Sequence, residues 1–256
     1  MPLLSRIHEA NRRLNDRFFP RSELRYVDRF KQLAAELSRD GQLVLHLGSG
    51  SNDLGSFPHV GSKRLQALNL DISHTDLRKN PGRLKIAADA QALPLGASSV
   101  DLICSEHVFE HFPRPQRVLE ECSRVLKEGG YLVVSGPNGW SYVALLARLT
   151  PLRFHAWVHR LGDGSSNNKS ILWPTFYRFS SPVAMRRMAQ KTGFEVASLQ
   201  TFVGEPCYTM YLPFLHLAFI AYHKVLEKLS PIFNFHMTSV VVLRKQREDL
   251  KVENRD

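Results

Sequence analysis

The hydrophobic positions of the chain change their spacing near residue 40. Over 3–18 and again over 22–39, apolar residues recur every three or four positions, which is the spacing of one face of a helix. Pro20 stands between the two segments, and proline interrupts a helix. The first part of the chain is therefore predicted to form two amphipathic helices.

Beyond residue 40 the apolar residues gather in short runs that lack strict polar alternation. Such strands are buried on both faces, as in a parallel sheet. An amphipathic segment over 115–130, which Gly129 and Gly130 are expected to stop, joins the fourth run to the fifth as a β-α-β unit. Alternating strands and helices predict a doubly wound α/β domain. The predicted strands cover 43–47, 66–71, 84–89, 99–105, 130–138, 194–203 and 235–245.

Two more helices are predicted in the second half of the chain. The segment after Ser181 has a proline at its first position and Gly193 after its end, which are the signals of a helix start and stop. The other helix falls in the apolar segment over 207–229. Its residues 212–229 fit either a buried lid helix or a helix that contacts a membrane surface, and the sequence leaves both open.

The change of pattern divides the chain into parts. Aromatic residues are frequent in two insertions that interrupt the regular α/β pattern, and such insertions commonly form lids over α/β sites. Those aromatic residues suit an apolar or ring-bearing substrate, or they pack the lid's own core. We expect N-terminal helices over 1–40, an α/β domain over 41–245 with insertions at 139–180 and 205–232, and a flexible tail over 246–256.

Composition and charge indicate which partners and which compartment suit the protein. A net charge of +10 favours an anionic partner such as a membrane surface, but no long Lys/Arg run occurs, so nucleic acid is disfavoured. Three cysteines without a C-x-x-C pair indicate a reduced, cytoplasmic protein, with membrane association left open. The first apolar run is too short for a signal peptide, and no run reaches transmembrane length.

Glycines and acids follow the predicted strands at regular places. Gly48 and Gly50 come directly after the first strand, and Asp71 ends the second strand about 20 residues later. Glycines let the backbone approach a nucleotide-like ligand, and an acid accepts from ribose hydroxyls. Asp89 ends the next predicted strand. Because parallel strands end at one sheet edge, these residues predict a nucleoside crevice there.

Four stretches follow one another in a characteristic order and spacing: VLHLGSGSN, LNLDIS, AADAQALPLGASSVDLICSEHVFEHF and RVLKEGGYLVVSGPN. Together they resemble the class I S-adenosylmethionine-dependent methyltransferases. The resemblance covers 40–140 well and 175–203 more loosely, and is greatest to the small-molecule branch with the quinone-biosynthesis enzymes. It implies a Rossmann-like seven-stranded sheet, mostly parallel with the last strand antiparallel. It also implies S-adenosylmethionine as cofactor and methyl transfer to a small or lipid-like acceptor by direct displacement.

The resemblance assigns roles around the first two strand ends. Gly48, Ser49 and Gly50 would pass under the methionine part of the cofactor. Asp71 would bind the ribose hydroxyls, and Ile72 would pack on the adenine ring.

The resemblance continues at later strand ends and fails at two positions. Asp89 would accept from the adenine amino group beside the Ala90 backbone, and Ser105 would face the sulfonium. The family usually has an acid where this chain has His46, and a third glycine where it has Asn52. The alternative is therefore a methyltransferase-like binding or scaffold module with a degenerate cofactor site.

The stretch SEHVFEHF, 105–112, contains the candidate residues for catalysis, as distinct from cofactor binding. His107 follows the fourth strand and is the candidate base for an acceptor that must lose a proton, or it only lines the pocket. Family resemblance makes Glu110 and His111 bracing residues. The letters H-x-x-E-H also occur in zinc peptidases, but Pro113 leaves room for only one helical turn, so no metal is expected.

Overall fold

The computed structural model describes most of the chain. Most of the predicted tail and most of the insertion over 139–180 lie outside the described residues, as does the third cysteine, Cys207. Cys104 and Cys122 are buried free thiols. The described residues are 2–19, 26–54, 64–141, 144, 173–202, 209–229 and 236–246.

The chain forms two compact units. The sheet unit consists of 26–137, 175–200 and 239–256. The helical unit consists of 1–25, 138–174 and 201–238. Within the described ranges, no helix is both long enough and apolar enough to cross a membrane.

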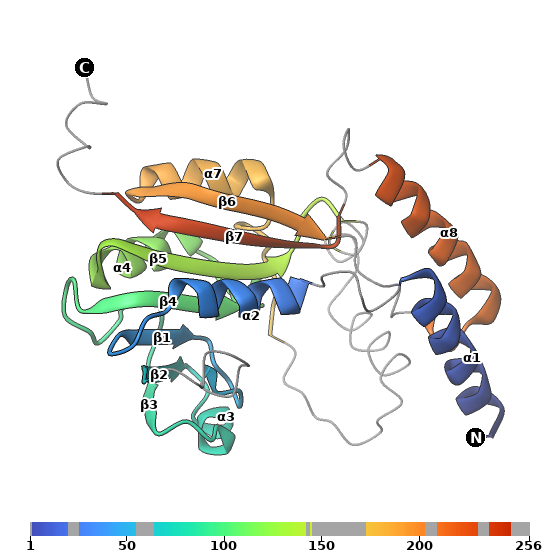
Figure 1. Cartoon of the computed structure of the whole chain (residues 1–256), viewed down its shortest axis with the longest axis horizontal. Helices are drawn as coiled ribbons and strands as arrows, with labels where there is room; N and C mark the ends of the chain where they lie inside the picture. The colour runs from blue at the N-terminus through green and yellow to red at the C-terminus, as the bar shows by residue number, and fades with distance from the viewer. Residues whose placement is uncertain are drawn as a thin grey trace. The chain divides into compact units, whose positions relative to one another are not determined.

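A seven-stranded sheet in the order β3-β2-β1-β4-β5-β7-β6 confirms the predicted doubly wound fold (Figure 1). The pairs β1–β2, β1–β4, β2–β3 and β4–β5 are parallel. The arrow of β7 points against those of its neighbours, as the resemblance implied. The strands are β1 (Leu43–Leu47), β2 (Gln66–Asp71), β3 (Leu84–Ala87), β4 (Val100–Glu106), β5 (Leu126–Pro137), β6 (Phe194–Phe202) and β7 (Thr238–Lys245).

Helices cover both faces of this sheet. α2 lies on one face and α4 and α7 lie on the other (Figure 1). The face under α4 and α7 holds a contiguous apolar core, in which Leu45 of β1 lies beside Leu68 and Ile103 of the neighbouring strands. The helices are α1 (Pro2–Phe18), α2 (Tyr26–Leu37), α3 (His74–Lys79), the one-turn 3-10 helix η2 (Phe109–His111), α4 (Pro115–Val125), α7 (Pro182–Lys191) and α8 (Pro213–Leu229).

The predicted end of the helix over 115–130 was wrong. α4 ends at Val125, and β5 already begins at Leu126. The carbonyls of Arg124 and Val125 accept from the backbone of the loop before β4, which draws the chain into the sheet early. Gly129 instead takes a left-handed φ of +70°, in the irregular part of the β4–β5 pairing.

Helix α3 was not predicted from the sequence. Its six residues are too few to show a helical period. Its N-terminal signal was nevertheless present, because the Ser73 hydroxyl accepts from Asp76 N at 3.3 Å. The same capping pattern was recognised at α7, where the Ser181 hydroxyl accepts from Ala184 N.

The sheet face away from α4 and α7 contains buried polar residues near the end of β1. His46 and Asn69 lie side by side on β1 and β2. The Asn69 amide donates to Asp53 Oδ1 at 2.9 Å. Burial lowers the pKa of His46 to about 4, although Asn69 and the Asp53 charge act in the opposite direction. The residue that replaces the family's usual acid is therefore a neutral imidazole at neutral pH.

We predict that His46 makes the folded state sensitive to acid. Its pKa falls from the ordinary histidine value of 6.5 to about 4 in the fold, so its stabilisation is complete above pH 6.5 and is lost as the pH falls towards 4. The free energy of unfolding should drop by about 2 kcal/mol more between pH 8 and pH 5 than without this group. In denaturant unfolding, the free energy of unfolding of His46→Gln should fall less between pH 8 and pH 5 than that of the wild type. An equal drop in both proteins would contradict the prediction.

Candidate functional site

The carboxyl ends of β1, β2 and β4 meet at one edge of the sheet, as their parallel pairing requires. The backbone amides of Gly48 and Ser49 both donate to the Leu70 carbonyl, at 2.7 and 3.0 Å. Ala88 N, just past β3, donates to the Asp71 carbonyl at 3.1 Å. The structure therefore brings together the loop after β1 and the ends of β2 and β3, where the predicted cofactor residues lie.

The loop after β1 needs both of its glycines. Gly48 and Gly50 have φ angles of +71° and +50°, which other residues rarely adopt. A Cβ on Gly48 would overlap the side chain of Val108, which follows β4. The loop thus lies against the end of β4 with no room for a side chain. Ser49 is buried, and its hydroxyl has no hydrogen-bond partner among the described residues.

The Asp71 carboxylate holds this loop to the end of β2. Gly50 N donates to its Oδ2 at 2.7 Å, and Ser73 N donates to its Oδ1 at 2.7 Å. A carboxylate has about four acceptor sites, so capacity remains for two hydroxyl donors. Next to it, Ile72 is 58% exposed, which leaves a free apolar surface at the rim. This pairing of a spare acceptor with an apolar platform suits a ribose and its base.

At the end of β3, Asp89 is exposed and Ala90 is buried. The Asp89 carboxylate accepts from Gln91 N at 2.8 Å, and from the Gln91 side-chain amide at 3.3 and 3.4 Å. An adenine amino group would compete with that amide. Gln91 was not predicted from the sequence, although a spacing of two residues from an aspartate is a common signal for this local bond.

Ser105 lies inside β4, one residue before the strand ends. The strand continues to Glu106, because Glu106 pairs with Ser135 on β5. Ser105 is fully buried, and its hydroxyl has no hydrogen-bond partner in the described part of the chain.

His107 is held in a strained conformation directly after β4. Its φ is +54°, and its backbone amide donates to the Ser135 carbonyl at 2.9 Å. Its Nδ1 lies 3.3 Å from Oε1 of the buried Glu110. The ring also meets Tyr26 edge to face, with centroids 5.3 Å apart. Within the described residues, Nε2 has no hydrogen-bond partner.

The charge of the His107 ring is tuned by opposing effects. Burial alone would lower the pKa of His107. The bond to Glu110 and the charges of Glu110 and Glu106 outweigh burial, and the pKa lies above its ordinary value. Glu110 also orients the ring, because an imidazole that donates Nδ1–H keeps its lone pair on Nε2.

The H-x-x-E-H stretch does not have the geometry of a zinc helix. Only Phe109–His111 form a 3-10 turn, and His107 lies outside it with left-handed backbone. The two histidines therefore do not share a helical face. Among the described residues, no three His, Cys, Asp or Glu side chains are grouped as metal ligands. The Glu110 carbonyl accepts from Phe176 N at 2.7 Å, so this turn also anchors the segment before α7.

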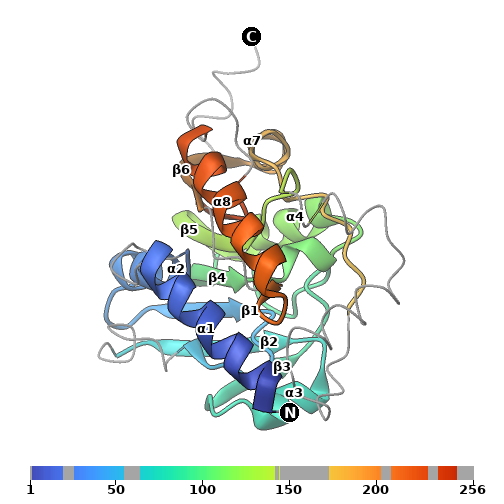
Figure 2. The ribbon, with the colours of Figure 1, turned by 90° about the vertical axis from the view of Figure 1, so that its right-hand side faces the viewer.

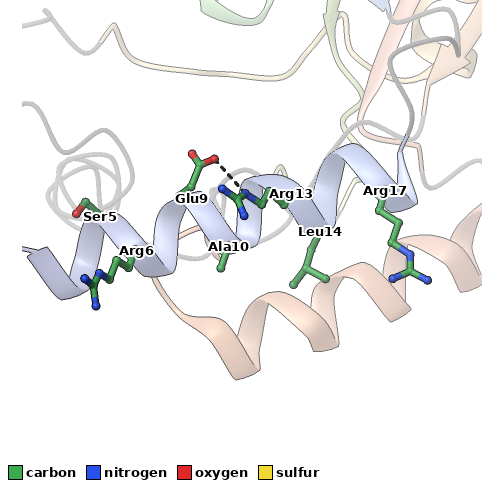
Figure 3. Close-up of a pocket in the computed structure, with 7 residues that line it drawn as sticks. All are labelled: Ser5, Arg6, Glu9, Ala10, Arg13, Leu14 and Arg17. Carbon is green, nitrogen blue, oxygen red and sulfur yellow. Dashed lines mark hydrogen bonds and ion pairs between the residues drawn. The ribbon is translucent and has the colours of Figure 1, made fainter.

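A separate hollow runs along α1 in the helical unit and contains none of the predicted site residues (Figure 3). Its lining residues are Ser5, Arg6, Glu9, Ala10, Arg13, Leu14 and Arg17.

Comparison with known proteins identifies the sheet unit. Residues 45–134 match the protein family described as a methyltransferase domain. The demethylmenaquinone methyltransferase of Thermotoga maritima is 28% identical over 204 residues, which cover 77% of this chain and 88% of the relative. The chloroplastic 2-methyl-6-phytyl-1,4-hydroquinone methyltransferase of Spinacia oleracea is 33% identical over 109 residues, 40% of this chain and 32% of the relative. The match to the spinach enzyme therefore spans about a third of its length.

Solved structures show the same fold. Phosphoethanolamine N-methyltransferase 2 of Haemonchus contortus, in complex with S-adenosyl-L-methionine, superposes with a TM-score of 0.54 at 13% identity. The superposition covers 86% of this chain and 53% of that chain. At this level of identity, the likeness establishes the fold alone.

We predict that Gly48→Ala weakens cofactor binding at least tenfold, because the added Cβ forces the loop away from Val108. Gly41→Ala is the matched control, since Gly41 has a similar φ of +81° but open space around its Cβ position. Titration calorimetry with S-adenosylmethionine measures the affinity of both variants, and Gly41→Ala should bind as tightly as wild type. Equal affinities in the two variants would show that the contact with Val108 does not shape the site.

Proposed function

Because this chain carries the domain of the class I S-adenosylmethionine-dependent methyltransferases, we propose that it methylates a quinone-like ring acceptor. It is an S-adenosylmethionine-dependent methyltransferase, and its cofactor is S-adenosylmethionine. The acceptor is the proposed part. The Thermotoga relative is named for a demethylated menaquinone, and the spinach relative is named for a phytyl hydroquinone. Both acceptors are rings with oxygen substituents.

The residues at the sheet edge fit the cofactor. In this proposal Gly48, Ser49 and Gly50 lie beneath its methionine part, and the buried Ser49 hydroxyl has bonding capacity to spare. The ribose takes the two unused acceptor sites of Asp71, and adenine lies on Ile72. The alternative, a binding module with a decayed site, was motivated by His46 and Asn52. In this proposal the neutral His46, which interacts with the backbone of Asn52, supports the loop of a retained site.

Two further cofactor residues belong to the proposal. Asp89, beside the buried Ala90 and released from Gln91, accepts from the adenine amino group. Ser105 supports the sulfonium end from within β4, where its buried hydroxyl has no partner among the described residues.

The proposed reaction needs a base as well as a cofactor. When bound, S-adenosylmethionine supplies a methyl group on a positively charged sulfur, which keeps the bonding electrons as the methyl moves to the acceptor. An acceptor ring hydroxyl must lose its proton as its oxygen, or the conjugated ring carbon, attacks. Nε2 of His107 receives that proton. Glu110 holds Nδ1–H, orients the ring and stabilises the imidazolium that forms.

We also place this activity in the cytoplasm and at a membrane surface. Two buried free thiols, Cys104 and Cys122, fit a reducing compartment. A lipid-like acceptor, such as the phytyl-bearing ring named for the spinach relative, would reside in a bilayer.

The first test of the cofactor assignment is Asp71→Asn. The variant should bind S-adenosylmethionine 10–100-fold more weakly, because hydrogen bonds to a charged acceptor contribute about 1.5–3 kcal/mol. Asp101→Asn is the control, since Asp101 accepts from Leu43 N at the other end of the strands. Unchanged affinity in Asp71→Asn would refute the assignment of the ribose to this residue.

The second test is the pH dependence of kcat/KM in the His107 and Glu110 variants. The wild-type rate should rise with pH as the imidazole loses its proton, with a midpoint above the ordinary histidine value. Glu110→Gln removes a cause of the raised pKa, so the midpoint should move to lower pH. His107→Asn should lower the rate by about 10²–10⁴-fold and leave cofactor affinity unchanged.

A structural role for this pair would give a different result. If Glu110 only supported the turn, Glu110→Gln would lower the plateau without moving the midpoint. His111→Asn serves as the neighbouring control and should keep the wild-type midpoint. A wild-type profile that stays flat through the histidine range would exclude His107 as the base.

A further inference from the structure

Helix α8 presents an apolar surface to solvent. At 100° per residue, its exposed apolar residues fall within an arc of roughly 160° around the helix axis. Phe214 is 87% exposed and Val225 is 53% exposed, although both are large apolar side chains. Contiguous apolar surface of this kind commonly marks an interaction site. The residues of this open face are Phe214, Leu215, Leu217, Ala218, Ala221, Tyr222, Val225 and Leu229.

The other side of α8 is buried against polar groups of the helical unit. α1 and α8 lie side by side in both ribbon views (Figures 1 and 2). His216 and His223 have no exposed surface. His216 Nδ1 is 2.9 Å from the Thr209 hydroxyl, and the His223 ring meets Phe19 edge to face. The helix thus buries its two histidines beside Ile220 and Leu226, yet leaves most of its large apolar residues exposed, whereas an ordinary surface helix turns its apolar residues inwards.

The polar partners on α1 explain this reversed orientation. Asn11 donates to the Met210 carbonyl at 2.8 Å, and Asn15 contacts the Met210 sulfur at 3.4 Å. Both asparagines are buried. These bonds fix the start of α8, so the helix cannot rotate its apolar side inwards without leaving buried amides unsatisfied.

Positive charges lie on and beside the open face. Lys228, in the last turn, is the single charged residue of α8 within the apolar arc, and Lys224, which pairs with Glu227 at 2.8 Å, flanks it. On α1, Arg6, Arg13 and Arg17 project within about 40° of one another around the helix axis. They line the hollow shown in Figure 3, together with Glu9, which pairs with Arg13 at 3.3 Å. The whole chain has a net charge of +10.

We propose that the open face of α8 docks the protein on the surface of a lipid bilayer that contains anionic lipids. α8 has 17 residues, lies in the plane of the interface and inserts Phe214, Leu217 and Val225 among the acyl chains. Lysine side chains at its edge reach the headgroups. A second copy of the chain fits this face less well, because symmetric pairing would bring the same positive charges together.

This docking surface deepens the proposed function, because a lipid-like ring acceptor would be drawn from the bilayer. Only this delivery of the acceptor from the bilayer rests on the proposed function. The exposed residues of α8 and the positive charges are observations on the helical unit alone, so docking and methyl transfer can be tested separately.

The test is co-sedimentation of the full chain with vesicles of phosphatidylcholine, with and without 30% phosphatidylglycerol. Wild type should bind the anionic vesicles, and binding should weaken as salt is raised. Phe214→Asp combined with Val225→Asp should reduce the partition coefficient at least tenfold, since two inserted apolar side chains are lost. Val183→Asp on α7 is the matched control, because Val183 is 61% exposed on the sheet unit, and it should bind as wild type does.

Three results would overturn the proposal. They are no binding of wild type to anionic vesicles, equal binding by the double variant, and a dimer in analytical ultracentrifugation that the double variant abolishes without any vesicle binding. Cofactor affinity of the same proteins is measured in parallel. An unchanged affinity for S-adenosylmethionine together with lost vesicle binding separates a failure of docking from a failure of the proposed function.

Discussion

The candidate site depends on one carboxylate. Asp71 accepts from Gly50 on one side and from Ser73 on the other, so a single group joins the loop after β1, the end of β2 and the start of α3. Such charge-assisted bonds to backbone amides are stronger than neutral ones. They hold the loop in a conformation in which its glycines adopt left-handed φ and its amides meet the end of β2. The same carboxylate keeps acceptor capacity for a ribose.

A second group of contacts also supports that loop. Asn80 donates to the carbonyls of Gly50 and Asn52, at 3.1 and 2.8 Å. Asn69 holds Asp53, and the neutral ring of His46 lies buried beside Asn69. His46 thus lies in a network of neutral polar side chains around Asp53 and the loop after β1. That network gives a physical reason why the loop keeps its shape without the acid that is usual in the family.

The two units combine different kinds of chemistry. The sheet unit contains the methyltransferase domain, with His107 and its orienting carboxylate after β4. The helical unit contains buried histidines and asparagines, and an apolar helix face directed to solvent. An enzyme with a lipid-like acceptor needs both a dry, ordered cofactor site and contact with the phase in which the acceptor dissolves. We assign the cofactor site to the sheet unit and the membrane contact to the helical unit, so a substitution in one unit can alter its role without altering the other.

The sequence by itself determined the strands, their doubly wound arrangement and the family, because buried parallel strands and glycine turns are local patterns with a fixed spacing. It also placed Gly48, Asp71, Asp89 and His107 at or just after the ends of the first four strands. Only the tertiary structure showed where Gln91, Val108 and Glu110 lie relative to them, since these contacts join residues through bends and close packing that no periodicity records. It also decided the early end of α4 and the orientation of α8. In both cases hydrogen bonds to a distant segment outweighed the preference of the local sequence.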